Sequence, residues 1–379
     1  MSENTYSQDL ALLRDRVEVL ELTGGGSRVA VAPAYQGRVM TSTLAGGEAS
    51  FGWLNAEFIA AGREDAVFSN YGGEDRFWLG PEGGQFGLWF RQGEPFDLDH
   101  WRTPEGFNAG AFGVTSRDGT SVTMAGQFAV TNGAGTAFQC AVERTVRLLD
   151  RARAAELLKA DLPEDVRMVA FESENVLANA SDAAWTRDGG LLSIWILGQF
   201  KPLPRGTVVV PFREGSEADF GVKATTNYFG EIPPERCRVE AGYVLFACDG
   251  RCRSKIGISP RRSKGVLGSY DPDAAVLTIV QFSQPLTAGE LPYVNSRWEI
   301  QEQPFAGDAI NSYNDGEAEP GAGQLGPFYE METSSPAAVL EPASALTHVH
   351  RTFHFTGEAD GLNALADKVL GIDLREVAI

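Results

Sequence analysis

Residues 121–148 read SVTMAGQFAVTNGAGTAFQCAVERTVRL, and this stretch decides the fold class. Apolar and polar side chains alternate along residues 121–130 and again along 138–148, and a turn signal, Asn132 followed by Gly133, lies between them. Alternation with a period of two places the apolar side chains on one face of a strand. The stretch therefore predicts two β-strands joined by a turn, each with one face against a core.

Strand-like stretches of the same kind recur along almost the whole chain. They are residues 17–22, 28–32, 38–43, 84–91, 168–173, 191–197, 207–211, 242–248, 275–282, 293–301, 328–333 and 347–355. The 43 glycines among 379 residues, together with 22 Phe, 9 Tyr and 7 Trp, are typical of many short strands joined by turns. Helical spacing is found only near the ends, over residues 7–17 with Ser7 as the cap and over 362–370 with Asp360 as the cap.

This pattern predicts an all-β protein built as one large two-sheet antiparallel β-sandwich with short terminal helices. No Pro/Ser-rich linker interrupts it, so we expect a single domain over residues 1–379, with an N-terminal helix in 1–17 and a C-terminal helix and tail in 360–379. The oligomeric state cannot be derived from these features.

Charge and missing motifs exclude several classes of function. The chain has 32 basic and 51 acidic residues, a net charge of −19, which repels nucleic acid and anionic lipid, so neither is expected as a partner. No apolar run reaches the roughly 18 residues of a membrane span, and residues 1–16 do not resemble a signal peptide. The four cysteines are expected to be reduced thiols, which favours a cytoplasmic location. No dinucleotide-binding, phosphate-loop or serine-hydrolase motif occurs, and no cofactor is expected.

Four stretches resemble the galactose mutarotase-like superfamily of aldose 1-epimerases and hexose-6-phosphate epimerases. Residues 27–42, SRVAVAPAYQGRVMTS, are similar to the first hairpin of that family, and 70–84, NYGGEDRFWLGPEGG, to the segment that brings an arginine to the sugar. Residues 171–179, FESENVLAN, are similar to the strand before the N-x-G region of the family. Residues 328–336, FYEMETSSP, with LEP at 340–342 and the strand 347–355, are similar to the closing pair that carries the catalytic glutamate.

The resemblance implies a galactose mutarotase-like β-sandwich that acts on a small-molecule carbohydrate. It implies an aldose epimerase or mutarotase-like isomerase that opens the ring of a free sugar or sugar acid by acid/base catalysis, with Glu332 removing the proton of the anomeric hydroxyl. The family takes its general acid, a histidine, from the middle of the chain, whereas residues 101–347 contain no histidine here. A non-catalytic carbohydrate-binding protein and an oligosaccharide lyase or hydrolase therefore remain as alternatives.

Glu330 and Glu332 are the first catalytic candidates. They are two residues apart in a predicted strand, so their side chains share one face about 7 Å apart. If that face lines a pocket, one carboxylate raises the pKa of the other and makes it a general base. The alternative is an exposed face that is acidic because the whole protein is acidic.

The remaining catalytic candidates are histidines of the last predicted strand. His348, His350 and His354 share one face, and the missing acid would be His348, His350 or the distant His100. Together with Glu330 or Glu332 they could also ligate zinc, but ordinary hydrogen bonds in the core are the preferred interpretation, and no metal is expected.

Substrate-binding candidates combine donors, acceptors and aromatic rings. Glu74, Arg76 and Trp78 alternate on one predicted face and form a set suited to sugar recognition, unless they are a salt bridge beside a core tryptophan. Lys255 interrupts an apolar stretch and either enters the pocket or protects a sheet edge. Five further candidates at strand ends and in loops are Asn314 and Asp315 as partners of Lys255, His100 as the sugar-binding histidine of the family, and Asn179 and Trp185.

Overall fold

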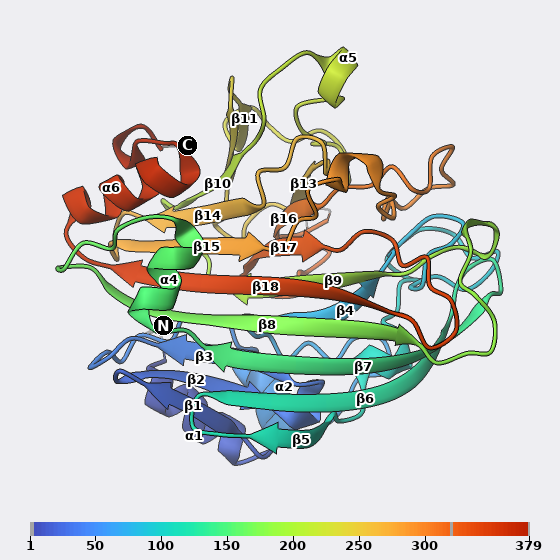
Figure 1. Ribbon diagram of the computed structural model, residues 1–379, viewed down its shortest axis with the longest axis horizontal. Coiled ribbons are helices and arrows are strands. Elements are labelled where there is room, and N and C mark those ends of the chain that lie inside the picture. Colours follow the sequence, from blue (N-terminus) through green and yellow to red (C-terminus); the bar gives the residue numbers. More distant parts are fainter. Residues whose placement is uncertain (1–3, 319–320, 378–379) are drawn as a thin grey trace.

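A computed structural model describes residues 4–318 and 321–377, in which a ten-stranded and a five-stranded antiparallel sheet face each other (Figure 1). The strands of the larger sheet are β5 (Gly113–Arg117), β6 (Ser121–Thr131), β7 (Ala137–Leu148), β8 (Arg167–Asn179), β10 (Thr207–Pro211), β11 (Cys237–Val239), β12 (Tyr243–Ala247), β14 (Val266–Asp271), β15 (Val276–Phe282) and β18 (Ala345–Thr356). Their order across the sheet is β11-β12-β10-β14-β15-β18-β8-β7-β6-β5.

The smaller sheet carries the candidate site. Its strands are β4 (Arg76–Gly80), β9 (Ser193–Phe200), β13 (Ser254–Ile258), β16 (Ile310–Asn314) and β17 (Tyr329–Ser334), in the order β13-β16-β17-β9-β4. A three-stranded sheet of β1 (Leu20–Gly24), β2 (Ser27–Ala32) and β3 (Arg38–Thr43) continues this layer. The three-stranded and five-stranded sheets are joined where Val39 and Asp75 exchange backbone hydrogen bonds of 3.2 and 3.3 Å.

Helices cover the outer surfaces of both layers. They are α1 (Tyr6–Arg14), α2 (Ala56–Ala61), α3 (Glu105–Asn108), α4 (Arg151–Leu158), α5 (Glu217–Phe220) and α6 (Ala359–Leu370). Helices α4 and α6 pack on the outer face of the ten-stranded sheet, whereas α1 and α2 pack on β2 and β3. In the described residues, no helix combines the length and the apolar character that crossing a membrane would require.

The alternation in β17 shows how the sequence separates core from site. Tyr329 and Met331 point inward and pack with Val208 and Val280 of the ten-stranded sheet, which closes the core between the layers. Glu330 and Glu332 point to the opposite face of the five-stranded sheet. Because each strand of the smaller sheet divides in this way, its outer face is free to carry polar groups.

The fold class predicted from the sequence is confirmed: the structure is an antiparallel two-sheet β-sandwich with few helices. Two predicted strands are wrong. Residues 84–91 and 293–301 are loops. Two hydrogen bonds join them: the Gln85 side-chain amide donates to the Gln301 backbone carbonyl at 2.9 Å and accepts from the Gln301 backbone N–H at 3.0 Å. Apolar side chains of both loops are buried, among them Leu88, Trp89 and Val294 in the cluster that contains Trp78 and Trp195 of the smaller sheet, which explains their strand-like pattern.

The predicted helix ends are also corrected. The first helix is capped by Thr5 with a capping box to Gln8, not by Ser7, and the last follows Glu358 as the cap, with Asp360 inside its first turn. Helix α4 was not expected. Residues 1–3 and 378–379 of the predicted terminal segments lie outside the described residues.

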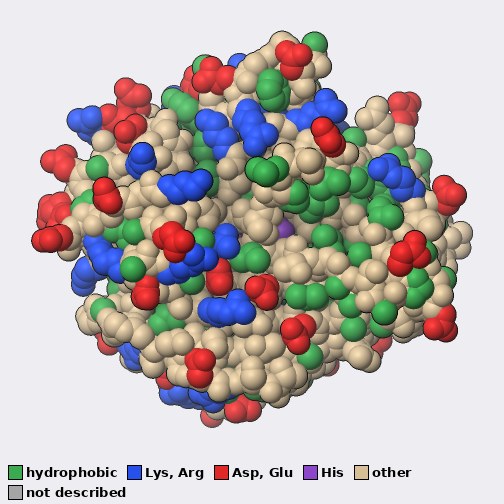
Figure 2. Space-filling model, viewed as in Figure 1, with side chains coloured by type: hydrophobic (Ala, Val, Ile, Leu, Met, Phe, Trp, Pro, Cys, Tyr) green, Lys and Arg blue, Asp and Glu red, His purple; other side chains and the backbone are tan. Residues whose placement is uncertain are grey.

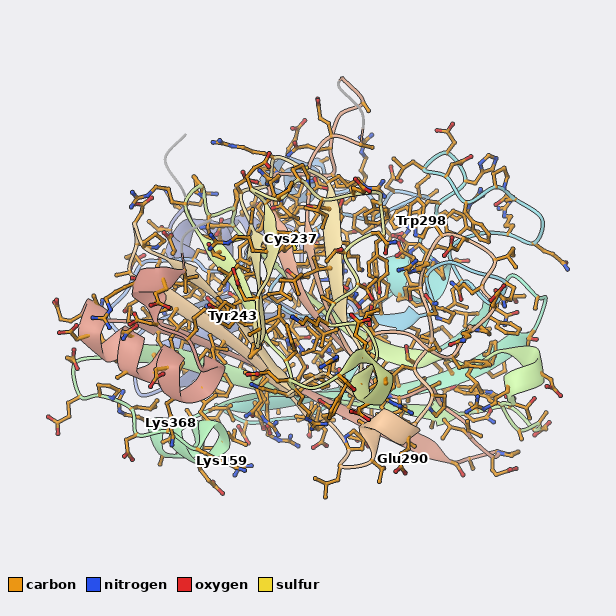
Figure 3. The ribbon with its side chains drawn as sticks, turned by 90° about the horizontal axis from the view of Figure 1, so that it is seen from above. Lys159, Cys237, Tyr243, Glu290, Trp298 and Lys368 are labelled. Carbon is orange, nitrogen blue, oxygen red and sulfur yellow. The ribbon has the colours of Figure 1, made fainter. Side chains whose placement is uncertain are left out.

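Acidic and basic side chains are interspersed over the face of the molecule seen in Figure 2. Seen from above, Trp298, which belongs to one of the two loops over the smaller sheet, lies on the side away from Lys368 of α6 (Figure 3). The candidate site is therefore distant from the helices that cover the larger sheet.

Candidate functional site

The register of the five-stranded sheet brings polar side chains into two neighbouring rows on its outer face. The first row is Lys255, Tyr313, Glu330 and Gln199, and the second contains Glu332, Leu197 and Arg76. Side chains directly opposite each other on paired strands lie on the same face, so five separate strands meet here. We call Arg76, Gln199, Lys255 and Glu330 the floor.

Above the floor is a pocket of about 390 Å³. It is lined by Val67, Phe68, Arg76, Trp78, Glu82, Leu98, Trp101, Trp195, Leu197, Gln199, Phe229, Arg253, Lys255, Trp298, Tyr313, Asp315, Gly316, Ala318, Ala322, Gly323, Gln324, Leu325, Phe328 and Glu330. This volume is in the range of small-molecule sites, about 300–1,000 Å³.

Buried ion pairs hold the floor in place. Arg76 Nη2 donates to Glu330 Oε1 at 2.8 Å, and Lys255 Nζ donates to Glu332 Oε2 at 2.9 Å. The indole N–H of Trp195 also donates to Glu332 Oε2, at 2.8 Å. Glu332 is fully buried, and because Lys255 and Trp195, which line the pocket, both donate to its Oε2, that atom is fixed from two sides.

The carboxyl groups around the pocket are harder to ionise than in water. Burial raises the pKa of Glu330 to about 7, although the Arg76 guanidinium beside it acts in the opposite direction. Burial also raises the pKa of Glu82, although the charge of Lys255 acts in the opposite direction. It likewise raises the pKa of Asp315, although the hydrogen bond from Tyr313 lowers it. Near neutral pH, protonated and ionised forms of Glu330 therefore coexist.

The cations respond to the same surroundings. Burial lowers the pKa of Arg76, although Glu330 and Glu332 favour its charged form. For Lys255 burial alone would lower the pKa, but the charges of Glu332 and Glu82 outweigh it, and the net shift is upward. Lys255 therefore remains an ammonium ion and is unsuited to act as an acid near pH 7.

Several polar atoms of the site have no hydrogen-bond partner in the described part of the chain. They are Arg76 Nε and Nη1, Gln199 Oε1 and Nε2, and Glu332 Oε1, all buried. A buried polar atom without a partner costs about 1–3 kcal/mol. Five such atoms in three neighbouring residues favour a bound ligand that supplies both donors and acceptors.

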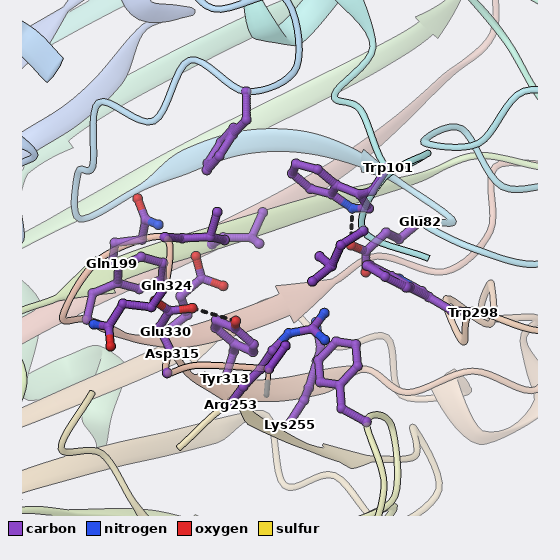
Figure 4. A pocket seen from close by; sticks show the side chains of 18 of the residues that line it. Glu82, Trp101, Gln199, Arg253, Lys255, Trp298, Tyr313, Asp315, Gln324 and Glu330 are labelled. Atoms are coloured by element: carbon purple, nitrogen blue, oxygen red, sulfur yellow. Dashed lines mark hydrogen bonds between the residues drawn. The ribbon is translucent and has the colours of Figure 1, made fainter. Parts of the chain in front are cut away.

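Aromatic rings surround this polar floor. They are Phe68, Trp78, Trp101, Trp195, Phe229, Trp298, Tyr313 and Phe328. Figure 4 shows Glu82, Trp101 and Trp298 on one side of the pocket and Gln199, Asp315 and Glu330 on the other. Hydrogen bonds fix both sides, from Trp101 Nε1 to Glu82 at 2.8 Å and from the Tyr313 hydroxyl to Asp315 at 2.6 Å.

The structure brings six of the predicted site residues together. Arg76, Trp78, Lys255, Asp315 and Glu330 line the pocket, and Glu332 is bound to Lys255 beneath it. The sequence analysis missed Glu82, Trp101, Trp195, Gln199, Arg253 and Trp298. Two of these, Trp195 and Gln199, are spaced by an even number of residues in β9, so the period of two could have found them.

Glu74 lies between the sheets and not in the pocket. Its carboxylate accepts hydrogen bonds from the Ser42 backbone N–H at 2.5 Å and the Ser42 hydroxyl at 2.9 Å, and contacts His354 Nε2 at 3.0 Å. The alternation that was expected to align Glu74 with Arg76 fails because β4 begins only at Arg76.

His348 and His350 also lie between the sheets. Thr333 Oγ1 contacts His348 Nε2 at 2.8 Å and His350 Nδ1 at 2.9 Å, on the face of β17 opposite to Glu332. Burial lowers the pKa of His348 to about 3 and that of His350 to about 4, so both rings are neutral near pH 7. Among the described residues, no group of three or more His, Cys, Asp or Glu is placed to hold a metal ion.

The other four predicted binding residues have structural contacts outside the pocket. His100 is partly exposed and pairs with Asp97 at 2.5 Å, although its neighbours Leu98 and Trp101 line the pocket. Asn314 accepts from the Gly250 N–H at 2.8 Å on the face opposite to Tyr313. The last two support a loop and the core: Asn179 donates to the Leu340 carbonyl at 3.1 Å, and Trp185 packs edge-on against Phe138.

Comparisons with known proteins give a family and a fold. Residues 4–379 match the model of a family described as a family of unknown function, DUF6786. No curated protein sequence matches the chain.

Among solved structures, the Slr1438 protein of Synechocystis sp. PCC 6803 is 13% identical with a TM-score of 0.51, over 94% of this chain and 99% of that one. An Escherichia coli K12 protein provisionally named an aldose 1-epimerase is 11% identical with a TM-score of 0.50, over 90% and 99%. Such low identities show the fold alone, which is that of the galactose mutarotase-like sandwich.

Proposed function

The chain belongs to the family of unknown function DUF6786, and we propose that its pocket binds a small carbohydrate, either a free sugar or a sugar acid. The observation that carries this proposal is the set of unpaired polar atoms of Arg76, Gln199 and Glu332 below a ring of aromatic side chains. A sugar offers hydroxyl groups that donate and accept, together with C–H faces that pack on aromatic rings. The E. coli protein of the same fold, provisionally named an aldose 1-epimerase, supports the same class of ligand.

In this proposal the polar side chains hydrogen-bond the sugar and the aromatic rings pack on it. The free N–H groups of Arg76 donate to ring or hydroxyl oxygens of the sugar, and Glu332 Oε1 accepts from a hydroxyl. Gln199 does both. The indole ring of Trp101 packs against the C–H faces, whereas the ring of Trp78 supports Arg76, whose guanidinium lies 3.8 Å from its centroid.

One observation favours a second candidate function, the interconversion of sugar anomers. The pKa of Glu330 is raised to about 7, so protonated and ionised forms coexist at neutral pH, as general acid–base catalysis requires. Glu332 Oε1 would take the proton of the anomeric hydroxyl while Glu330 gives a proton to the ring oxygen. The ring C–O bond breaks, the open-chain aldehyde rotates, and the reverse transfers close the ring as the other anomer. Glu330 would then do what a histidine does in the epimerases.

Binding and catalysis are tested separately. Calorimetric titration with a panel of monosaccharides and uronic acids tests binding, and a protein that binds none of them contradicts the main proposal. Proton NMR of freshly dissolved single anomers, with spontaneous mutarotation subtracted, tests interconversion.

The decisive variant for interconversion is Glu332→Gln, which keeps the shape of the site. We expect it to change sugar affinity only a few-fold and to slow interconversion by about 10²–10⁴. Glu341→Gln, an exposed residue outside the pocket, is the matched control. A wild-type protein that binds sugar but never exceeds the uncatalysed rate would leave binding as the function.

A further inference from the structure

Three large apolar side chains surround the opening of the pocket, and we call them the mouth. Val67, Leu98 and Leu325 are 49%, 47% and 43% exposed, and all three line the pocket. Single exposed apolar side chains are ordinary on protein surfaces. Here three of the ten large ones that the described residues expose come from separate loops and meet at one opening.

The pocket wall below the mouth is aromatic. Phe229 and Trp298 pack edge to face with their ring centroids 5.6 Å apart. The Arg253 guanidinium, which also lines the pocket, lies 3.8 Å from the centroid of Phe229 and 5.2 Å from that of Trp298. The pocket thus changes from a polar floor to an apolar mouth.

The size of the pocket agrees with a ligand of two parts. A volume of about 390 Å³ is typical of sites for drug-sized molecules, and a single sugar ring is smaller than such ligands. A sugar on the floor would leave the mouth exposed to water. A ligand that also covers the mouth gains the free energy of burying apolar surface on both partners.

We propose that the ligand is a glycoside with an apolar aglycone, whose sugar ring binds the floor and whose aglycone packs between Val67, Leu98 and Leu325. This inference rests on the proposed function, because it assigns the floor to the sugar. It concerns binding only: a glycosidic bond at the anomeric carbon prevents the ring from opening, so such a ligand is not interconverted.

Matched pairs of ligands test the inference. Calorimetry would compare the methyl and phenyl glycosides of the same sugar in the same anomeric form, for glucose, galactose, mannose, xylose and glucuronic acid. For the sugars that bind, we expect the phenyl glycoside to bind about tenfold more tightly than the methyl glycoside, because the phenyl group buries more apolar surface.

Variants of the mouth locate the effect. Leu98→Ser and Leu325→Ser should each reduce the ratio of phenyl to methyl affinity to about threefold or less, since each removes apolar contact area. Leu286→Ser is the matched control, because Leu286 is a fully exposed leucine outside the pocket, and it should leave the ratio unchanged. Both mouth positions are exposed, so folding should be preserved, and circular dichroism would verify this.

The possible results separate the two proposals. Equal affinities within every pair, or a ratio that the mouth variants do not reduce, would overturn the aglycone site and leave sugar binding intact. Phenol alone binding as tightly as the phenyl glycosides would overturn both proposals, because the sugar would then contribute nothing. Failure of all the glycosides to bind while free sugars bind would overturn only the aglycone site.

Discussion

At the residue scale, Gln199 is the least satisfied side chain of the floor. Both its amide oxygen and its amide nitrogen are buried without a partner in the described part of the chain. We expect Gln199→Leu, which has a similar volume, to increase the free energy of unfolding by about 1–2 kcal/mol, because it removes both unpaired groups. The same change should weaken sugar binding, and urea denaturation together with calorimetric titration would measure the two effects.

The control for this change is Gln139→Leu, an exposed glutamine of β7. There we expect a change of less than about 0.5 kcal/mol and normal sugar binding. If Gln199→Leu instead destabilises the protein and leaves affinity unchanged, Gln199 has a structural role and does not contact the ligand.

Glu330 should make stability depend on pH. Burial raises the pKa of its carboxyl from 4.5 to about 7, so between these values the folded protein holds a proton that the unfolded chain has released. Its contribution to stability is therefore present at low pH and lost as the pH rises from about 4.5 to 7. Glu330→Gln should remove this decline, which urea denaturation at several pH values would detect, and an identical pH profile in both proteins would contradict the predicted shift.

At the scale of one element, strand β17 joins the site to the interior. Its outer face carries Glu330 and Glu332, and on its inner face Thr333 Oγ1 lies between His348 and His350. One hydroxyl satisfies a nitrogen of each ring, so the two histidines support the strand from behind.

The change Thr333→Val tests this support. Valine has the shape of threonine but no hydroxyl, so two buried ring nitrogens would lose their partner. We expect the free energy of unfolding to fall by about 2–3 kcal/mol, since each unpaired polar group costs about 1–3 kcal/mol. Thr115→Val, in the exposed edge strand β5, should change it little. An equal effect of the two substitutions in chemical denaturation would show that the hydroxyl at Thr333 is unimportant.

The limits of sequence reasoning also appear at this scale. The period of two correctly placed Glu330 and Glu332 on one face, because that rule is local to a strand. It failed for Glu74, because the strand begins two residues later and no local signal marks its start. Whether a strand face meets solvent, a pocket or another sheet depends on pairing across the whole chain, which explains why the histidines of β18 were expected at the site but lie in the core.

Loops were the least predictable part of the pocket. Residues 84–91 and 293–301 have the alternating apolar pattern of strands, yet they are loops, and the side chain of Gln85 makes two hydrogen bonds with the backbone of Gln301. Consequently Glu82 and Trp298 were missed, since the sequence alone does not indicate which loops meet above a sheet.

At the scale of the whole molecule, helices complete the burial of the larger sheet. Helix α6 covers apolar groups on the outer face of that sheet with Leu362, Leu365 and Leu370. Deleting residues 359–379 should expose this surface, so we expect stronger binding of the dye ANS and a lower urea midpoint. The full-length variant Lys368→Ser, altered only at the exposed side of α6, should behave as the unaltered protein.

The ion pair of Arg76 with Glu330 has a consequence for biosynthesis. Its two members are 254 positions apart, and β9 and β13, which supply the rest of the floor, are translated in between. A ribosome must therefore release the chain past Glu330 before the floor exists, and a nascent chain that ends before Glu330 has no complete pocket. Retention on an immobilised ligand would accordingly select molecules that extend past Glu330, and ligand present during translation would act only after Glu330 has left the ribosome.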